Sequence, residues 1–305
     1  MKSNFPRIGL AKLCGWFGIT RQAYYQNTWS GIGISIEEDL VLKQVLLIRK
    51  NHSRMGARKL QTMLQPFLME HQIKLGRDGL FDLLAANCML VKRKKRRVQT
   101  TWSHHWLRKY PNLIRDFVPT QPNQLWVSDI TYWKVMDHNF YLTFITDAYS
   151  HKIVGYQIAE TLESIECVKA LEMALKSLRG KVYKLLHHSD RGVQYCSSDY
   201  VKKLQDHEIQ ISMTENGDPL ENAVAERING IIKEEYLFTY DIKSLDQAPI
   251  MLKRAIELYN TERPHLSISN LTPEYVHTSK LSLNIERLWK NYYKKNTILV
   301  KPFQD

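Results

Sequence analysis

The sequence lacks the features that mark secreted, zinc-binding and membrane proteins. Four cysteines are scattered over 305 residues, and no two of them form a C-x-x-C pair. Neither a disulfide framework nor a cysteine-based zinc site is expected, and free thiols fit a reducing cytosol. No run reaches the ~18–20 apolar residues of a membrane span, and the N-terminus has no apolar core of a signal peptide. These absences favour a cytoplasmic protein without a membrane segment.

Acidic residues are scarce in the first two-fifths of the chain. Residues 1–120 contain 21 Lys and Arg against 7 Asp and Glu, whereas residues 121–305 contain 22 against 24. The whole net charge of +12 therefore comes from the N-terminal part. A basic segment joined to a near-neutral one indicates a polyanion-binding region attached to a second module, and the length allows two or three domains.

The N-terminal pattern predicts a short helix-turn-helix. Residues 10–25 form two helical segments around Gly18, with Thr20 as the N-cap of the second. Arg21 and Gln22 would then contact base edges or phosphates. An ordinary helical hairpin fits the same pattern, so both interpretations stay open. The Gly- and Ser-containing residues 27–36 are predicted to be a linker.

A second helix-turn-helix is predicted from three helices at 37–50, 57–68 and 77–87, the first with Leu40, Val41, Val45 and Ile48 on one face. Six consecutive cations follow, close to Trp102 and Trp106. A run of charge is usually a solvated segment, but beside a helical DNA-binding pattern it indicates an arm that follows the phosphate backbone. The DNA contacts expected here are Arg58, Lys59, Arg77, Lys92, Arg93, Lys94, Lys95, Arg96 and Arg97.

The rest of the chain predicts an α/β catalytic core. Strands are expected at 125–133, 140–147, 152–159, 182–187 and 209–213, and helices at 164–178, 198–206, 220–236 and 244–260. Three strands, then β–α alternation, then a helix bearing an acid is the order of an RNase H-like α/β fold, with a mixed five-stranded sheet. The expected organisation is a helix-turn-helix-like segment at 1–30, a second such domain with its basic arm at 37–98, a linker at 99–122, the core at 123–240, and a helical region with a basic tail at 241–305.

Three acidic residues of this core fit one metal-dependent nuclease site. Asp129 lies in an apolar strand-like run, Asp190 follows another apolar run, and Glu226 lies on a helical pattern. Carboxylates in apolar segments are costly to bury unless they are paired or bind a metal. Two Mg²⁺ ions held by such carboxylates can activate a water or a 3′-hydroxyl and stabilise the leaving oxygen of a phosphodiester.

The helix that bears Glu226 has two distinct faces. Val224, Ile228 and Ile231 fall on one side, and the opposite side carries Asn222, Glu226, Asn229, Gly230 and Lys233. Lys233 lies two turns beyond Glu226, where it could hold a DNA phosphate beside the scissile bond. A surface helix with a solvated polar face fits the helix alone equally well.

An ordered set of motifs resembles the DDE transposases of bacterial insertion sequences, the branch with a retroviral-integrase-like core. The matching segments are G-A-R-K-L (56–60), W-x-x-D-I-T-Y (126–132), T-D-A-Y-S (146–150), H-S-D-R-G-x-Q-Y (188–195), S-M-T-x-N-G-x-P-x-x-N-A-x-A-E (212–226), Y-N (259–260), R-P-H (263–265) and T-P-E-Y (272–275). The resemblance implies that Asp129, Asp190 and Glu226 are the catalytic triad and bind two Mg²⁺ or Mn²⁺ ions. The sequence departs from the family pattern at Glu221, at Arg227-Ile228 and at His151, none of which is a metal ligand.

Several other residues are candidates for contact with the DNA. Gln194, Tyr195, Asn222, Arg263 and His265 are predicted to lie against it, although an ion pair that anchors the C-terminal helix explains Arg263 equally well. Asp147, at a strand end near Asp129, is better explained by a role in a turn.

The combined prediction is a transposase that cuts a DNA strand at the element ends and transfers the 3′-hydroxyl to a new phosphodiester. The resemblance implies a circular intermediate and double-stranded DNA as the partner. It also implies a homo-oligomer that holds two ends, and an upstream-frame partner with a helix-turn-helix and a zipper. A plain RNase H-like nuclease and a catalytically inactive DNA-binding regulator are the alternatives.

Overall fold

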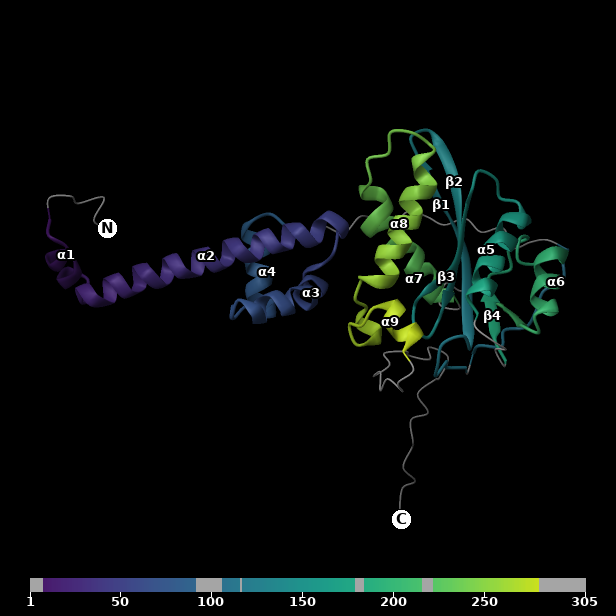
Figure 1. The fold of residues 1–305 in the computed structure, drawn as a ribbon, viewed down its shortest axis with the longest axis horizontal. Helices are drawn as coiled ribbons and strands as arrows, with labels where there is room; N and C mark the ends of the chain where they lie inside the picture. The colour runs from purple at the N-terminus through teal and green to yellow at the C-terminus, as the bar shows by residue number, and fades with distance from the viewer. Residues whose placement is uncertain (1–7, 92–105, 116, 179–183, 216–221, 280–305) are drawn as a thin grey trace, which may run out of the picture. The chain divides into compact units, whose positions relative to one another are not determined.

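The computed structural model describes residues 8–91, 106–115, 117–178, 184–215 and 222–279, without the side chains of 26–35. The chain divides into two compact units (Figure 1). The first comprises Met1–Asn51 and Gly56–Val91, and the second comprises His52–Met55 and Lys92–Asp305. None of the described helices is long and apolar enough to cross a membrane.

The first unit is helical, with α1 (Leu10–Trp16), α2 (Arg21–Asn51), α3 (Ala57–Glu70) and α4 (Arg77–Ala86). The turn between α1 and α2 is as predicted. Gly18 adopts a φ of +67°, which favours glycine, and the Thr20 hydroxyl accepts a hydrogen bond from the Ala23 amide. The basic run at 92–97 lies outside the described residues.

The predicted linker at 27–36 is wrong, because α2 runs without interruption for 31 residues. Gly31 and Gly33 each cost a helix about 1 kcal/mol relative to alanine. No proline interrupts the segment, however, and each residue added to an existing helix gains a hydrogen bond. Of the apolar face predicted within this helix, Val41 and Val45 are fully buried.

The second unit contains the predicted RNase H-like sheet. Its strands are β1 (Leu125–Val135), β2 (His138–Asp147), β3 (Ile153–Ala159), β4 (Leu186–Ser189) and β5 (Gln210–Met213), in the order β3-β2-β1-β4-β5. The first three pair antiparallel, and β4 and β5 run parallel to β1. Residues 182 and 183 of the strand predicted at 182–187 lie outside the described residues, and β4 begins at Leu186, two residues after Lys184 with its positive φ. Residues 106–115 and 117–122, within the predicted linker, form neither helix nor strand. The Leu113 amide donates to the Ser212 hydroxyl of β5, and the Pro111 carbonyl accepts from the Met213 amide.

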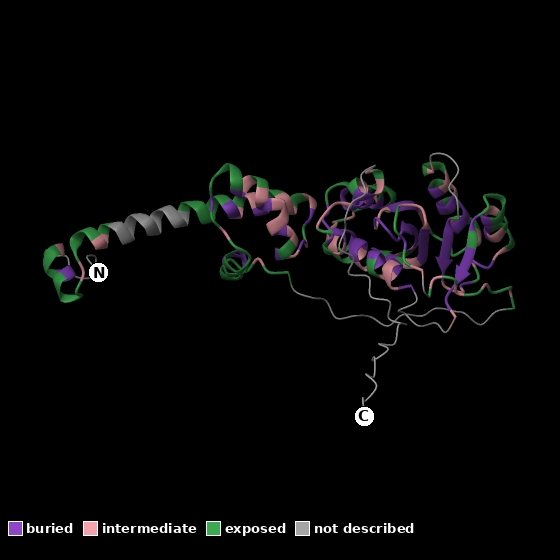
Figure 2. Ribbon diagram, turned by 90° about the horizontal axis from the view of Figure 1, so that it is seen from below, coloured by how far each residue is buried: buried purple, intermediate pink, exposed green. Residues whose placement is uncertain are grey.

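Helices cover both faces of the sheet (Figures 1 and 2). One face packs Trp126 and Ile145 against α5 (Ser164–Ser177) and α6 (Ser198–Asp206). The other packs Trp133 and Phe144 against α7 (Ala223–Ile231) and α8 (Gln247–Thr261). Because β1 is central and buried on both faces, its polar residues lie where helices and strands converge.

The helix that bears Glu226 changes its winding as it leaves the sheet. After α7 the chain makes a π-helical turn, Ile232–Tyr236, and a 3₁₀ turn, Leu237–Thr239, where the sequence predicts one regular helix. Single π-turns of this kind are frequent at functional sites, and this one contains Lys233. A further 3₁₀ turn, Leu266–Ile268, and α9 (Pro273–Thr278) complete the described chain.

Candidate active site

Asp129 is a buried carboxylate in the middle of β1. The residue is 8% exposed, and each carboxylate oxygen accepts one hydrogen bond. The Ile130 amide donates to Oδ1 at 2.9 Å, and Asn229 Nδ2 donates to Oδ2 at 2.7 Å. Asn229 comes from α7, so this bond ties the helix to the strand at the carboxylate.

Asp190 stands directly after β4, the parallel neighbour of β1. The pairing of Val127 with His188 brings the exit of β4 beside Asp129, because parallel strands end at the same edge of a sheet. The Gly192 amide donates to Asp190 Oδ1 at 2.9 Å, which shapes the turn after the strand. Asp190 is partly buried.

Glu226 is in the first turn of α7 and is also partly buried. The helix is fixed against β1 on both sides of it. Asn222 Nδ2 donates to the Ser128 carbonyl at 2.8 Å, and Asn229 binds Asp129. Strand, strand exit and helix therefore present one carboxylate each.

The three carboxylates interact electrostatically. Burial raises the pKa of Asp129 well above its ordinary value, and the negative charges of Asp190 and Glu226 raise it further. Among the described residues, no group of three or more His, Cys, Asp or Glu side chains already has the spacing of a metal-binding site. The donors are all oxygens, however, and a bound cation would relieve their mutual repulsion, so the set fits Mg²⁺ or Mn²⁺.

Lys233 supplies positive charge next to this acidic group. Its Nζ donates to Thr131 Oγ1 at 2.9 Å and lies 4.7 Å from the centre of the Tyr132 ring. Burial lowers the pKa of Lys233, and the charge of Asp129 opposes that effect. The polar face of α7 therefore packs on β1, and the alternative of a fully solvated face is wrong.

Comparison with known proteins identifies the family. Two models described as "Integrase core domain" match residues 119–219 and 207–273. The chain is 36% identical over 265 residues to the insertion element IS600 31 kDa protein of Shigella sonnei, covering 86% of this chain and 96% of that protein. It is 30% identical over 264 residues to the transposase of insertion sequence IS629 from the same organism, covering 84% and 87%. The chain belongs to the integrase-core transposases of bacterial insertion sequences.

A solved structure, the HTLV-2 integrase catalytic core domain in complex with magnesium, matches this transposase over 52% of its chain and 97% of the viral one. The identity is 22% and the TM-score is 0.42. The assignment of this transposase to its family rests on the core-domain match and on the two bacterial relatives. The strand order described above agrees with it.

Four of the DNA contacts predicted for the transposase core do not fit the structure, because the side chains are buried. Tyr195 is 1% exposed and packs on Tyr200 beneath the sheet. Arg263 is 1% exposed and forms a bidentate pair with Glu235, with Nε and Nη2 at 2.8 and 2.7 Å from its carboxylate oxygens. The ion-pair explanation of Arg263 is therefore the right one. The other two are Asn222 and His265, each 6% exposed.

Other predicted contacts remain accessible. Gln194 donates to the Leu162 carbonyl and is partly exposed. In the N-terminal unit Arg21, Gln22 and Arg58 are exposed. Lys59 is partly exposed, and Arg77 is exposed and bound to Asp78. Contact of these residues with DNA stays a prediction.

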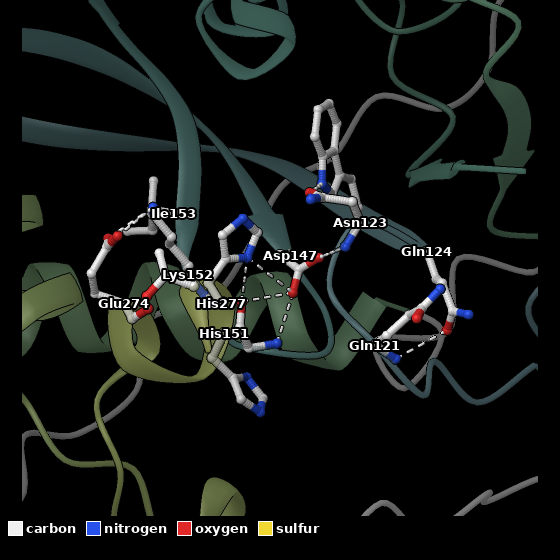
Figure 3. Close-up of polar contacts among 12 residues, drawn as sticks. Gln121, Asn123, Gln124, Asp147, His151, Lys152, Ile153, Glu274 and His277 are labelled. Atoms are coloured by element: carbon white, nitrogen blue, oxygen red, sulfur yellow. Dashed lines mark hydrogen bonds and ion pairs between the residues drawn. The ribbon is translucent and has the colours of Figure 1, made fainter. Parts of the chain in front are cut away.

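Asp147 is confirmed in a turn. It is fully buried and accepts hydrogen bonds from the amides of Asn123 and Ser150, each at 2.7 Å (Figure 3). The Ser150 hydroxyl bridges Asp147 to His277 Nδ1, and the neighbouring Lys152 pairs with Glu274. These contacts attach α9 to the ends of β2 and β3.

Asn229 is the site residue that sequence reasoning missed. The helical pattern places it on the polar face of its helix but assigns it no role. The available signal was its position three residues after Glu226, which places both side chains on the same face of α7.

Proposed function

We propose that Asp129, Asp190 and Glu226 are the catalytic carboxylates with which this transposase cuts a DNA strand at its element ends and transfers the 3′-hydroxyl to a new phosphodiester. The observation that carries the proposal is the convergence of three carboxylates from β1, the exit of β4 and α7. Burial and then the charges of Asp190 and Glu226 raise the pKa of Asp129. A buried carboxylate with two acidic neighbours is costly in a structural role and useful as a cation site.

Asp129, Asp190 and Glu226 would hold two Mg²⁺ or Mn²⁺ ions. When bound, the ions would activate the attacking water or 3′-hydroxyl and stabilise the leaving oxygen. Asp129 could hold a cation, because each of its oxygens accepts one hydrogen bond and keeps a lone pair for a ligand. Integrase cores depend on divalent metal, and the HTLV-2 core was solved with magnesium.

The remaining residues position these groups and the substrate. Asn229 and the Ile130 amide fix the rotation of the Asp129 carboxylate. Lys233 donates to Thr131 and lies against the Tyr132 ring, and its ammonium would meet a phosphate next to the scissile bond.

The proposed substrate is double-stranded DNA, first at the element ends and then at the target. The excess positive charge of residues 1–120 supports binding of the ends by the N-terminal part. Two ends must be joined in one reaction, so a homo-oligomer is expected, with a helix-turn-helix and zipper product of an upstream frame as a further partner.

The test is cleavage and joining of duplexes that carry the element ends, in Mg²⁺, read on a sequencing gel. Asp129→Ala and Asp190→Asn should each lower cleavage by at least about 10³-fold, because nucleophile and leaving group lose their cation. Both variants should bind the duplex as the wild type does. Cleavage by either variant at the wild-type rate would refute the assignment, and cleavage without joined product would favour a plain nuclease.

A further inference from the structure

Strand β1 extends well beyond its neighbour β4. The pairing of β4 involves only Leu125–Val127, whereas β1 continues to Val135. In the part of the chain that the structure describes, β1 therefore has no strand beside it on this side from Asp129 onward. The triad stands at the start of an open strand edge.

Tyr132 lies on that edge and is 48% exposed. Thr131 and Tyr132 point to opposite faces of the strand, yet Lys233 Nζ contacts the hydroxyl of one and the ring of the other. The ammonium must therefore lie at the edge, between the two faces. This cation–π contact involves the Tyr132 ring, and about half of the residue stays exposed to solvent.

A hollow opens on the same sheet face as Tyr132. Tyr141, its cross-strand partner, lines this shallow hollow together with Ile130 and Gln194. Because side chains alternate along β1, Ile130 and the hollow lie on the sheet face opposite Asp129, and the strand edge at Tyr132 lies between the two faces.

We propose that Tyr132 stacks on an unpaired base of the nucleotide next to the scissile phosphodiester. The inference rests on the proposed function, since it places DNA at Asp129. Aromatic rings stack on bases of any sequence, and such stacking offsets the cost of taking a base out of the duplex. The Lys233 ammonium, fixed against the ring, would meet the phosphate of the same nucleotide.

Binding of forked DNA tests the subsite independently of cleavage. The probe is a labelled duplex of the element end whose base pairs at the cut site are mismatched, with Ca²⁺ in place of Mg²⁺. The wild type should bind the fork more tightly than the paired duplex. Tyr132→Leu should weaken fork binding about tenfold, the loss expected for one base–aromatic stack. It should leave binding of a fork with an abasic site at the stacked position unchanged.

Two controls separate stacking from other effects. Tyr132→Phe keeps the ring and should bind the fork as the wild type does. Tyr275→Leu removes a ring that is 50% exposed on α9. It should leave the affinities for the intact fork and for the abasic fork unchanged. An equal loss on intact and abasic forks, or no loss on either, would overturn the stacking role. A Tyr132-dependent fork preference in a chain that never cuts DNA would support the subsite and refute the proposed catalysis instead.

Discussion

One amide side chain explains how Asp129 is held in place beside two other carboxylates. Asn229 Nδ2 donates to Asp129 Oδ2, whereas a carboxylate in its place would add a fourth negative charge. The amide oxygen of Asn229 is buried and has no hydrogen-bond partner among the described residues. A buried acceptor without a partner is costly. We therefore infer that the role of Asn229 is to donate its Nδ2 hydrogen bond to Asp129.

His187 should make the stability of the second unit, which we call the catalytic unit, decrease at acid pH. It is buried, and Nε2 lies 3.0 Å from the Ser128 hydroxyl and 2.9 Å from that of Tyr200. Burial first, and then the neighbouring His188, lower the pKa of His187 from 6.5 to about 3. A histidine depressed in this way contributes stability that is complete above pH 6.5 and is lost as the pH falls toward 3. We expect the shifted pKa of His187 to lower the free energy of unfolding by about 2 kcal/mol between pH 7 and pH 5.

Urea unfolding of the wild type and of His187→Asn at these two pH values measures this contribution. The variant will be less stable throughout, but its stability should fall by about 2 kcal/mol less than that of the wild type between pH 7 and 5. His207→Gln, a change at an exposed histidine, should keep the wild-type dependence. An unchanged slope in His187→Asn would show that this histidine is not the group that titrates.

Residue types and their contexts were enough to predict that Asp129, Asp190 and Glu226 come together in the fold. They were not enough to predict which neighbouring residues are buried. Asp129, Asp190 and Glu226 each follow or interrupt an apolar segment, which the sequence displays directly. The sequence predicts DNA contact for Tyr195 and allows either DNA contact or an ion pair for Arg263, because hydrophobic periodicity does not predict the exposure of a loop residue. Only the packed structure shows that both are buried.

At the scale of the elements, strands and helices were predictable where one pattern dominates. The antiparallel β1, β2 and β3 agree with the predicted ranges to within two residues, since their apolar and β-branched content is high. The linker at 27–36 failed because glycine lowers helix propensity without forbidding a helix. The π-turn at Ile232–Tyr236 leaves no signature in periodicity, because it adds a single residue to an otherwise helical pattern.

Close contact between β3 and α5 depends on Gly155. A Cβ at this position would meet the Ala170 carbonyl oxygen and would lie 2.9 Å from Ala174 Cβ. Gly155→Ala should therefore push the helix off the sheet and cost about 1–3 kcal/mol of the free energy of unfolding. Urea denaturation followed by circular dichroism measures the loss.

Gly230→Ala is the matched control, because a Cβ there has no heavy atom within 4 Å and the residue lies in α7. It should stabilise the protein by up to about 1 kcal/mol through helix propensity. A loss at Gly155 no larger than the effect at Gly230 would contradict the close packing.

At the scale of the whole molecule, charge separates the part expected to bind DNA from the part expected to cut it. Residues 1–120 carry all of the excess positive charge. We expect the affinity of the full chain for element-end DNA to fall steeply with salt. Replacing Lys92–Arg97 with serine should reduce the slope of log affinity against log salt by up to about 5, at ~0.9 for each phosphate that is no longer neutralised. Titrations by fluorescence anisotropy between low and physiological salt measure both slopes, and an unchanged slope would exclude the run from the interface.

The chain passes from one compact unit to the other more than once. It leaves the N-terminal unit after Asn51, contributes His52–Met55 to the catalytic unit, returns at Gly56, and leaves again after Val91. His52 is buried there between the Tyr236 hydroxyl and Glu262. A chimera with a foreign DNA-binding module therefore cannot be made at a single junction. Grafting at residue 92 alone would discard a histidine that the catalytic unit uses, and a working graft must carry those four residues along.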